Sequence, residues 1–298
     1  MSAIERKAAL SLEPWPSLPL EAWEQTYATL HMWLQIVGHI RMAFSPKLNH
    51  FWNVTLYVTP RGLTTSAVPY DAGIFEIRFD FIDHLLEIIT SKGEQRQLKL
   101  RPIAVADFYV ELLAALATLG VQVHIHGKPD EVPNPIPFAQ DRVHASYDPE
   151  YANRFWRILV SVEKVFQQFR AEFLGKCSPV HFFWGSFDFA VTRFSGRPAP
   201  ERTGADLITR EAYSHEVSSA GFWPGSGSIH APAFYSYTVP EPKGFSDQPV
   251  RHKQAYYDPQ LKEFLLMYDD VRSAPSPEKM LLEFLQSTYE ACLLYTSD

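Results

Sequence analysis

The sequence predicts an α+β protein built from two related halves in tandem, each made of a long helix, an antiparallel meander and a closing helix. Amphipathic helical stretches alternate with runs of short strands, and the connections between those strands are short, as in antiparallel sheets. A pattern that opens with Ser-Pro, passes a His and a Phe-Trp pair and closes with Val-Thr, Arg and Gly occurs twice, over residues 45–62 and 178–197. We therefore expect the halves to face each other about a pseudo-twofold axis and to share one core.

The first half is expected to follow an extended N-terminal arm over residues 1–20, in which three prolines disfavour helix and Trp15 docks the arm on the body. The half itself spans residues 21–128. It opens with a helix over 21–44, whose apolar residues recur at helical spacing and which Pro46 ends. Strands are expected over 52–59, 63–68, 74–81, 85–90 and 97–101, then a helix over 104–119 and a short strand over 121–126.

A proline-rich linker over residues 129–147 leads to the second half, over 148–292. Asp148 followed by Pro149 is typical of an N-cap and first helical position, so a helix is expected from there to about residue 174. Strands are expected over 181–192, 233–239 and 262–271, and a last helix from Pro277 through Tyr289. Residues 293–298 do not continue that helical pattern and are interpreted as a non-native-looking tail without a function.

Composition excludes several classes of protein. Hydrophobic residues make up 46% of the 298 and charged ones 20%, which is globular composition. The formal net charge of −7 argues against nucleic acid as a partner, because phosphate binding needs clustered Lys and Arg. The sequence contains no apolar run of about 18 residues, which a membrane span would need, and the N-terminus has no secretory pattern. With only two cysteines, a disulfide framework is excluded, and a cytoplasmic location is expected.

Four long segments carry a resemblance to a known family: residues 49–65, 177–197, 213–225 and 284–291. In these motifs the chain resembles a bacterial family of uncharacterised proteins, catalogued as domain of unknown function 5996. The likeness covers nearly the whole chain from Trp15 onwards. Since the family itself looks uncharacterised, the resemblance implies little about activity, cofactor or partner.

Ligand sites commonly form where two halves of a protein meet, so the leading hypothesis is a small organic molecule bound in an aromatic-lined cleft between the halves. Asp188 interrupts an aromatic strand, and a carboxylate buried without a partner costs several kcal/mol, roughly. The expected partner is Arg193, Arg197, Arg61 or a histidine. The predicted binding residues are His181, Trp184, Arg193, Trp223, His50 and Arg61, and the predicted catalytic residues are His215, Glu216 and Asp188. In a catalytic version, His215 or Glu216 would move a proton and Arg193 would hold an anionic group.

Two alternatives stand beside this hypothesis. The first is a non-enzymatic structural or interaction protein whose aromatic residues fill the core. The second is a metal-dependent enzyme using His181 and His215, although the chain lacks the His-Glu-x-x-His pattern of zinc proteases. Glycine-rich nucleotide-binding motifs and a Gly-x-Ser-x-Gly elbow are also missing from the sequence. The residues alone therefore identify neither a reaction nor a cofactor, and they leave the oligomeric state open.

Overall fold

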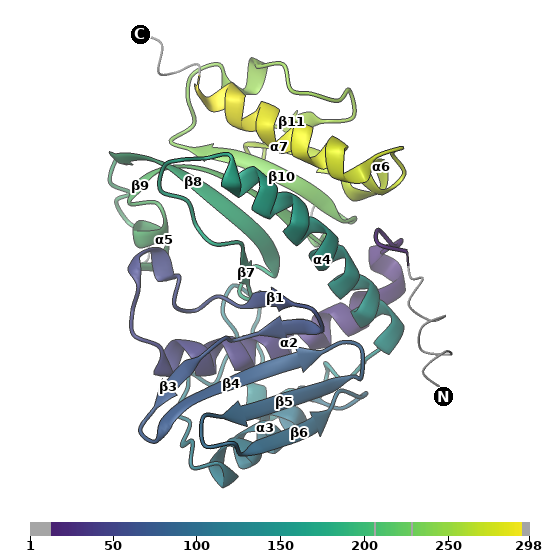
Figure 1. The fold of residues 1–298 in the computed structure, drawn as a ribbon, viewed down its shortest axis with the longest axis vertical. Helices are drawn as coiled ribbons and strands as arrows, with labels where there is room; N and C mark the ends of the chain where they lie inside the picture. Colours follow the sequence, from purple (N-terminus) through teal and green to yellow (C-terminus); the bar gives the residue numbers. More distant parts are fainter. Residues whose placement is uncertain (1–12, 206, 228, 294–298) are drawn as a thin grey trace.

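The computed structural model describes residues 13–205, 207–227 and 229–293 of the 298-residue chain. Two antiparallel sheets, each packed by long helices, confirm the predicted α+β class (Figure 1). Among the described residues, no helix is long and apolar enough to cross a bilayer.

The first sheet is a meander whose outer face is polar. Its strands β1 (Tyr57–Thr59), β2 (Gly62–Thr64), β4 (Gly73–Asp80), β5 (Leu85–Thr90) and β6 (Gln95–Lys99) pair in that order, and β3 (Val68–Tyr70) pairs with β4. On β4, Phe75, Ile77 and Phe79 are buried, whereas the alternating Glu76 and Arg78 are only half-buried, which is the period-two pattern of a sheet covered on one face. The helices of this half are α2 (Leu20–Phe44) and α3 (Val105–Thr118), where the Trp33 and Phe108 rings stack 4.7 Å apart.

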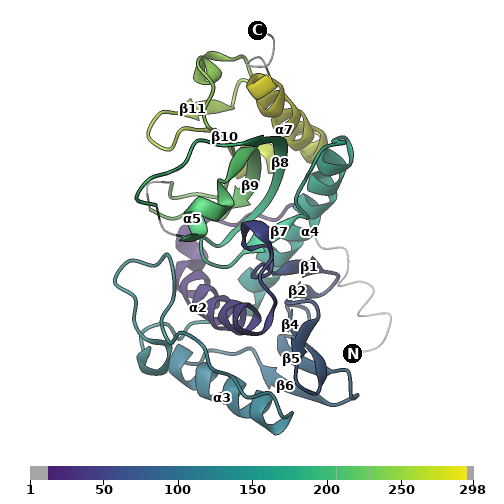
Figure 2. The same cartoon turned by 90° about the vertical axis from the view of Figure 1, so that its left-hand side faces the viewer.

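The second sheet has its two long helices on one face. Its spatial order is β11-β12-β10-β9-β8-β7, and α4 (Pro149–Ala171) and α7 (Pro277–Leu293) cover the face that carries Phe189 and Phe222 (Figures 1 and 2). The opposite face carries Asp188 and a group of hydroxyl side chains, which line a cavity described below. The strands are β7 (His181–Phe183), β8 (Asp188–Pro198), β9 (His215–Trp223), β10 (Ala233–Val239), β11 (Tyr256–Asp258) and β12 (Glu263–Met267). Short helices are α5 (Leu207–Ala212), α6 (Tyr268–Arg272) and the 3-10 turns η1 (Asn49–Phe51), η2 (Phe138–Gln140) and η3 (Phe245–Asp247).

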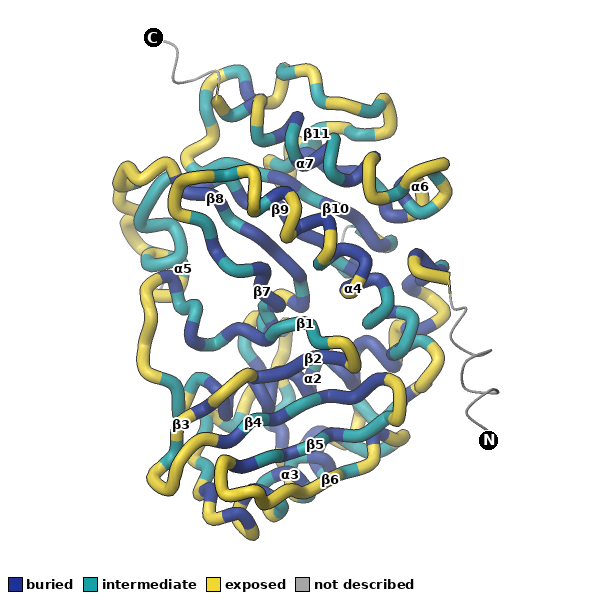
Figure 3. Tube along the Cα trace, viewed as in Figure 1, coloured by how far each residue is buried: buried dark blue, intermediate teal, exposed yellow. Residues whose placement is uncertain are grey.

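The two sheets meet at one bridge. Leu56, just before β1, and Phe182 of β7 exchange two backbone hydrogen bonds of 2.9 Å each in antiparallel pairing. Around this bridge, the rings of Phe155, Phe182 and Phe187 pack together, and Trp23 and Tyr27 of α2 pack against Phe155 and Phe187 respectively. Most of α2 is buried between the halves, as the dark tube in Figure 3 shows. One hydrophobic core therefore extends through both halves.

Both halves share an element order of long helix, six-stranded antiparallel sheet and helix. The first strands of the two meanders, β1 and β7, are the ones that approach each other, and they do so antiparallel. This is the arrangement that a pseudo-twofold relation requires. An internal duplication itself stays a prediction.

Several expected strands differ in the structure. Residues 181–192 form a hairpin rather than one strand, because the chain turns over residues 184–187 and Phe187 takes a positive φ of 58°. Its ring is fully buried in the cluster at the bridge, which stabilises this unfavourable backbone. The start of the first motif is η1 and a turn, and residues 121–126 form no strand. Residues 215–223, for which no element was predicted, form β9, and the end of the strand expected over 262–271 is α6.

The N-terminal arm docks as expected where the structure describes it. Trp15 is buried and packs on Tyr268, with 6.3 Å between ring centroids. Ser161 and Arg157 of α4 donate hydrogen bonds to the carbonyl oxygens of Pro14 and Glu13. Residues 1–12 of the arm and 294–298 of the predicted tail lie outside the described residues.

Candidate functional site

A cavity of about 690 Å³ lies where the halves meet. Its floor is the face of the second sheet opposite α4 and α7, on β8, β9 and β10. Met42 and the segment around η1 come from the first half, Asp130 and Glu131 come from the linker, and α5 contributes the remaining side. The aromatic residues that line it are Phe51, Trp52, Phe183, Trp184, Phe194, Tyr213, Tyr235 and Tyr237.

Asp188 holds the polar end of the floor. Its carboxylate accepts hydrogen bonds from the Tyr235 hydroxyl and from Ser186 Oγ, the latter at 2.5 Å. Burial raises the pKa of Asp188, and the two hydroxyl donors lower it by less. Burial and the neighbouring Asp188 also raise the pKa of Tyr235, so this hydroxyl stays protonated and donating at neutral pH.

Hydroxyl pairs continue the floor away from Asp188. Tyr213 and Tyr237 lie with their oxygens 3.0 Å apart, and Thr192 Oγ1 lies 2.9 Å from Ser219 Oγ. Alternate residues of β8, β9 and β10 point to this face, and the register places Thr192 beside Ser219 and Ser219 beside Tyr237. The floor is therefore a layer of neutral hydrogen-bonding groups with one carboxyl group at its end.

The partner of Asp188 differs from the one expected. Among the residues that the structure describes, the groups that bind its carboxylate are hydroxyls, and no Arg, Lys or His lies within ion-pair distance. Arg193 points to the opposite face of the sheet, because it lies five positions after Asp188 on β8 and successive side chains alternate between the faces. Arg197 instead pairs with Glu216 at 2.8 Å. The prediction of a cationic partner for Asp188 was wrong.

Trp184 forms the wall between the cavity and α2. Its Nε1 donates a 2.7 Å hydrogen bond to the Val54 carbonyl, and its ring packs against His39. Gly38 of α2 lies beneath that ring. A Cβ at Gly38 would lie 2.3 Å from three ring atoms of Trp184, which is far inside van der Waals contact. The close approach of α2 to the wall therefore requires glycine.

Replacing Gly38 by alanine is expected to destabilise the protein by about 2 kcal/mol, although alanine favours helix by about 1 kcal/mol. The methyl group would displace the Trp184 ring and weaken its hydrogen bond to Val54. Chemical unfolding and the tryptophan emission spectrum measure both effects. Gly127→Ala is the control, because a Cβ there meets no atom within 4 Å. A stabilised Gly38→Ala protein would contradict the expectation.

The mouth of the cavity carries a neutral histidine. His50 Nδ1 lies 3.0 Å from the Glu211 carbonyl oxygen, and its Nε2 lies 2.6 Å from Lys176 Nζ. These partners fit a tautomer that donates from Nδ1 and accepts the lysine proton at Nε2. Burial lowers the pKa of His50, and the charge of Lys176 lowers it further. Lys176 Nζ also lies over the rings of Phe194 and Trp52, at 4.6 and 5.4 Å from their centroids.

The linker is fastened over the cavity by polar side chains of α2. Gln35 Nε2 donates to the Asp130 carbonyl at 2.8 Å, and the Asp130 amide donates back to Gln35 Oε1 at 3.0 Å. The Asp130 carboxylate lies 3.1 Å from His39 Nε2. The His31 Nε2 atom lies 2.9 Å from the carbonyl oxygens of both Trp184 and Gly185. These contacts fix the linker and the β7–β8 turn against the same helix.

A family model described as "Family of unknown function (DUF5996)" matches residues 15–295, which is nearly the whole chain. The chain belongs to the DUF5996 family. This confirms the resemblance noted in the motifs, and the match includes the first residues of the predicted tail. No curated protein and no solved structure matches the chain.

Three of the predicted site residues of the DUF5996 chain, His50, Trp184 and Asp188, line the cavity together. His215 lies just behind its mouth, with its ring 5.8 Å from that of His50 and its Nδ1 3.1 Å from Ser214 Oγ. Glu216 accepts from Arg197 Nε and Ser195 Oγ, each at 2.8 Å, outside the lining. Trp223 ends β9 and does not line the cavity.

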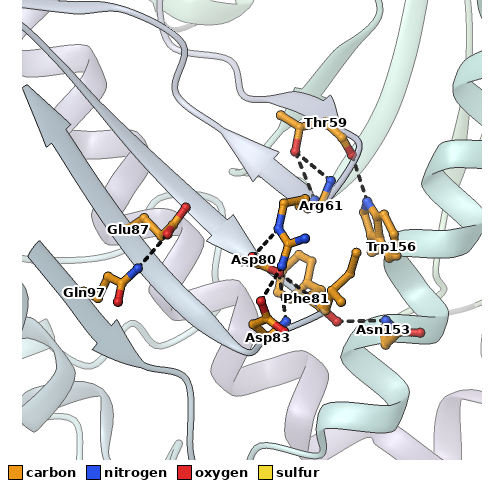
Figure 4. A network of polar contacts seen from close by, with 11 residues as sticks. Thr59, Arg61, Asp80, Phe81, Asp83, Glu87, Gln97, Asn153 and Trp156 are labelled. Atoms are coloured by element: carbon orange, nitrogen blue, oxygen red, sulfur yellow. Dashed lines mark hydrogen bonds and ion pairs between the residues drawn. The ribbon is translucent and has the colours of Figure 1, made fainter. Parts of the chain in front are cut away.

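His181 and Arg61 have structural surroundings instead. His181 is buried among the rings of Trp52, Tyr57 and Phe183, and burial lowers its pKa to about 3. Arg61 lies on the turn between β1 and β2, where Figure 4 shows it paired with Asp80 at 2.5 Å and with Asp83 at 2.6 Å. In the same view, Trp156 and Asn153 of α4 donate hydrogen bonds to the carbonyl oxygens of Thr59 and Phe81, so this region joins the first sheet to α4.

Sequence reasoning missed Tyr213, Tyr235 and Tyr237, which form most of the cavity floor with Asp188. Tyr235 and Tyr237 alternate with buried Phe234 and Ser236 on a strand that was predicted correctly. Two hydroxyl-bearing rings two residues apart on one face were the available signal. Over the described ranges, no group of three or more His, Cys, Asp and Glu side chains is placed to hold a metal ion.

A second carboxyl group that interacts with Asp188 lies on β12, two strands beyond β9 in the same sheet. Burial raises the pKa of Glu263 to about 7, with further contributions from Asp188 and Asp258. Below about pH 4.5 this group is protonated in both the folded and the unfolded state. Between 4.5 and 7 the folded state alone keeps the proton, so the contribution of Glu263 to stability falls as pH rises through that range.

Glu263→Gln is therefore expected to stabilise the protein at pH 8 and not at pH 4. Linkage gives up to about 3 kcal/mol for such a shift, and about half of that for a side chain that is partly solvated. The measurement is the difference in unfolding free energy between Glu263→Gln and wild type against pH. The difference is needed because buried His31 and His181, with pKa values lowered to about 4 and about 3, give the opposite slope. A difference that does not change with pH would contradict the expectation.

Proposed function

We propose that this DUF5996 chain binds a small organic cation, an amine with an aromatic or apolar body, in the cavity between its halves. The observation that carries the proposal is the charge of the lining. Asp130, Glu131 and Asp188 supply three carboxyl groups, and among the lining residues that the structure describes there is no Lys or Arg. An ammonium group would supply the opposite charge that Asp188 lacks in the protein itself.

The aromatic lining supports the same ligand class. A cation over the face of an aromatic ring gains about 0.5–2 kcal/mol, and more when water is excluded. Tyr213, Tyr235 and Tyr237 surround the region of Asp188 with rings as well as hydroxyls. At the mouth, Lys176 already lies over two rings of the lining, so the faces of these rings attract a cation within the protein.

The shape of the floor suggests how such a ligand would lie. Asp188 and Phe194 both face the cavity from β8, and six residues of strand separate them by roughly 20 Å. If the ammonium group binds at Asp188, the body of the ligand would lie along the hydroxyl pairs and point toward Trp52 and Phe194. These pairs offer oxygen acceptors and donors for hydroxyl or amide groups of the ligand.

An enzymatic version of this proposal rests on Asp188 and Tyr235. A carboxyl group whose pKa is raised by burial and which accepts from a tyrosine hydroxyl is suited to proton transfer. His215 and Glu216 lie outside the cavity and would not take this role directly.

The proposal further includes a duplicated origin of the two halves and a cytoplasmic location.

The rival interpretation, an interaction protein whose aromatics merely fill the core, is separated from ligand binding by titration calorimetry. We suggest three ligands that share one ring and differ in the end group: tyramine, tyrosol and 4-hydroxyphenylacetate. Tyramine is expected to bind at least about tenfold more tightly than neutral tyrosol, and the anion is expected not to bind. Equal affinities, a preference for the anion or no binding of tyramine would contradict the proposal.

A further inference from the structure

A second cavity, of about 730 Å³, lies on the other face of the second sheet, at the C-terminal ends of α4 and α7. Most of its wall is apolar, from Phe173, Leu174, Val239, Pro240 and Pro242. Its charged lining differs from that of the acidic cavity, because three cations, Arg193, Arg197 and Lys243, stand against two carboxylates, Glu216 and Glu241. The charged pair of Arg197 and Glu216 lies at its edge.

Arg193 is a buried cation without a carboxylate partner. It is 2% exposed, and among the described residues no Asp or Glu oxygen lies within 4.0 Å of its guanidinium. One hydrogen bond, from Nη2 to the Phe169 carbonyl, is made, and its buried Nε has no partner. The rings of Phe169 and Tyr289 hold the group, with centroids 3.5 and 4.3 Å from Cζ. A guanidinium has five donors in a fixed fork, and in Arg193 the Nε donor is buried without a partner.

Two hydroxyls continue the polar row next to Arg193. Cross-strand pairing places Arg193 beside Ser218 and Ser218 beside Thr238, so the three side chains share the cavity face of β8, β9 and β10. Thr238 Oγ1 is buried without a nitrogen or oxygen partner among the described residues, and the Cys292 thiol of α7 lies against both Ser218 and Thr238. A row of one guanidinium and two hydroxyls at the base of an apolar cavity matches a carboxylate attached to an apolar body.

We propose that this second cavity binds an apolar carboxylic acid, with its carboxylate on Arg193, Ser218 and Thr238 and its hydrocarbon part between the ends of α4 and α7. The carboxylate would accept from the Arg193 guanidinium and would replace the weak contact of the Cys292 thiol at the two hydroxyls. It would also neutralise a cation that burial otherwise makes costly. The burial of Arg193 also lowers its pKa, which is the mark of a guanidinium without sufficient compensating charge. The two cavities share Phe194 and Val217 in their linings, but the charged groups that would hold each ligand, Asp188 in the first and Arg193 in the second, lie on opposite faces of the sheet.

The experiment measures the binding of decanoate to the full-length protein by titration calorimetry. Decanol and decyltrimethylammonium, which have the same chain length but a neutral and a cationic end group, are titrated in the same way. Decanoate is expected to bind at least about tenfold more tightly than decanol, because hydrogen bonds to a charged group contribute most of the selectivity. The cation is expected not to compete. Equal binding of decanoate and decanol, or no binding of decanoate, would overturn the proposal.

Variants locate the site. Arg193→Met keeps the length of the side chain and is expected to reduce decanoate affinity to that of decanol. If this variant does not fold, Ser218→Ala and Thr238→Val test the same carboxylate, each with an expected loss of about three- to tenfold. Asp188→Asn is the control, because Asp188 lies in the other cavity and its replacement should leave decanoate affinity unchanged. Loss of decanoate binding in Asp188→Asn, or wild-type binding in folded Arg193→Met, would refute the assignment.

Discussion

Asp188→Asn is expected to lower the affinity for tyramine at least about thirtyfold while it raises the stability of the unliganded protein. Removing one partner of a desolvated charge pair costs about 2–5 kcal/mol of binding free energy. Asparagine has the same shape: its Oδ1 can accept from one of the two hydroxyls, and its Nδ2 can donate to the oxygen of the other once that hydroxyl rotates, so the floor keeps its geometry. The stability gain follows because burial raises the pKa of Asp188, which means that the folded state disfavours the ionised form.

The pH dependence of binding gives a second reading of the same group. A protonated Asp188 carries no charge, so tyramine affinity is expected to fall as pH decreases through the pKa of Asp188, while the ammonium group stays charged throughout. Asp188→Asn should remove this dependence. The control is Asp269→Asn, the same chemical change at a side chain that is 78% exposed and far from the lining. An Asp188→Asn protein that binds tyramine as wild type does would rule out Asp188 as the recognition group.

The α+β class and most element bounds could be predicted because they depend on local patterns. Asp148 shows this: its side chain accepts from the amides of Glu150 and Tyr151 at 2.9 and 3.3 Å, and α4 begins where the cap and proline predicted. The strict alternation of β4 likewise predicted its buried face. In each case the residues that decide the structure lie within one turn or one strand of each other.

The composition of the cavity could not be predicted because it depends on contacts between distant residues. The hydrogen bond from Tyr235 to Asp188 joins residues 47 apart, and it requires the register of three strands. The turn at residues 184–187 also makes the predicted faces of this segment wrong. A single strand over 181–192 would place Phe182 and Asp188 on the same face. In the hairpin, Phe182 instead lies opposite Phe189 and is fully buried, whereas Asp188 lies opposite Phe183 at the cavity.

Phe182→Ala is expected to destabilise the protein by about 3–5 kcal/mol, the range for a fully buried phenylalanine. Phe182 forms the backbone bridge with Leu56, and its ring packs on Phe155 and Phe187, so the void would open where both halves share their core. Chemical unfolding measures the loss. The matched control is Phe183→Ala on the same strand, whose half-buried ring lines the cavity and should cost less than half as much.

The form of that unfolding transition tests how strongly the halves depend on each other. One continuous core predicts a single cooperative transition in wild type, because neither sheet buries its apolar face without α2 and α4. A void at the bridge weakens the packing between the halves more than it weakens the packing inside either half. Phe182→Ala is therefore expected to broaden the unfolding transition or to divide it in two. Equal losses of unfolding free energy in Phe182→Ala and Phe183→Ala, with an unchanged single transition, would mean that the bridge does not hold the two halves, and hence the cavity, together.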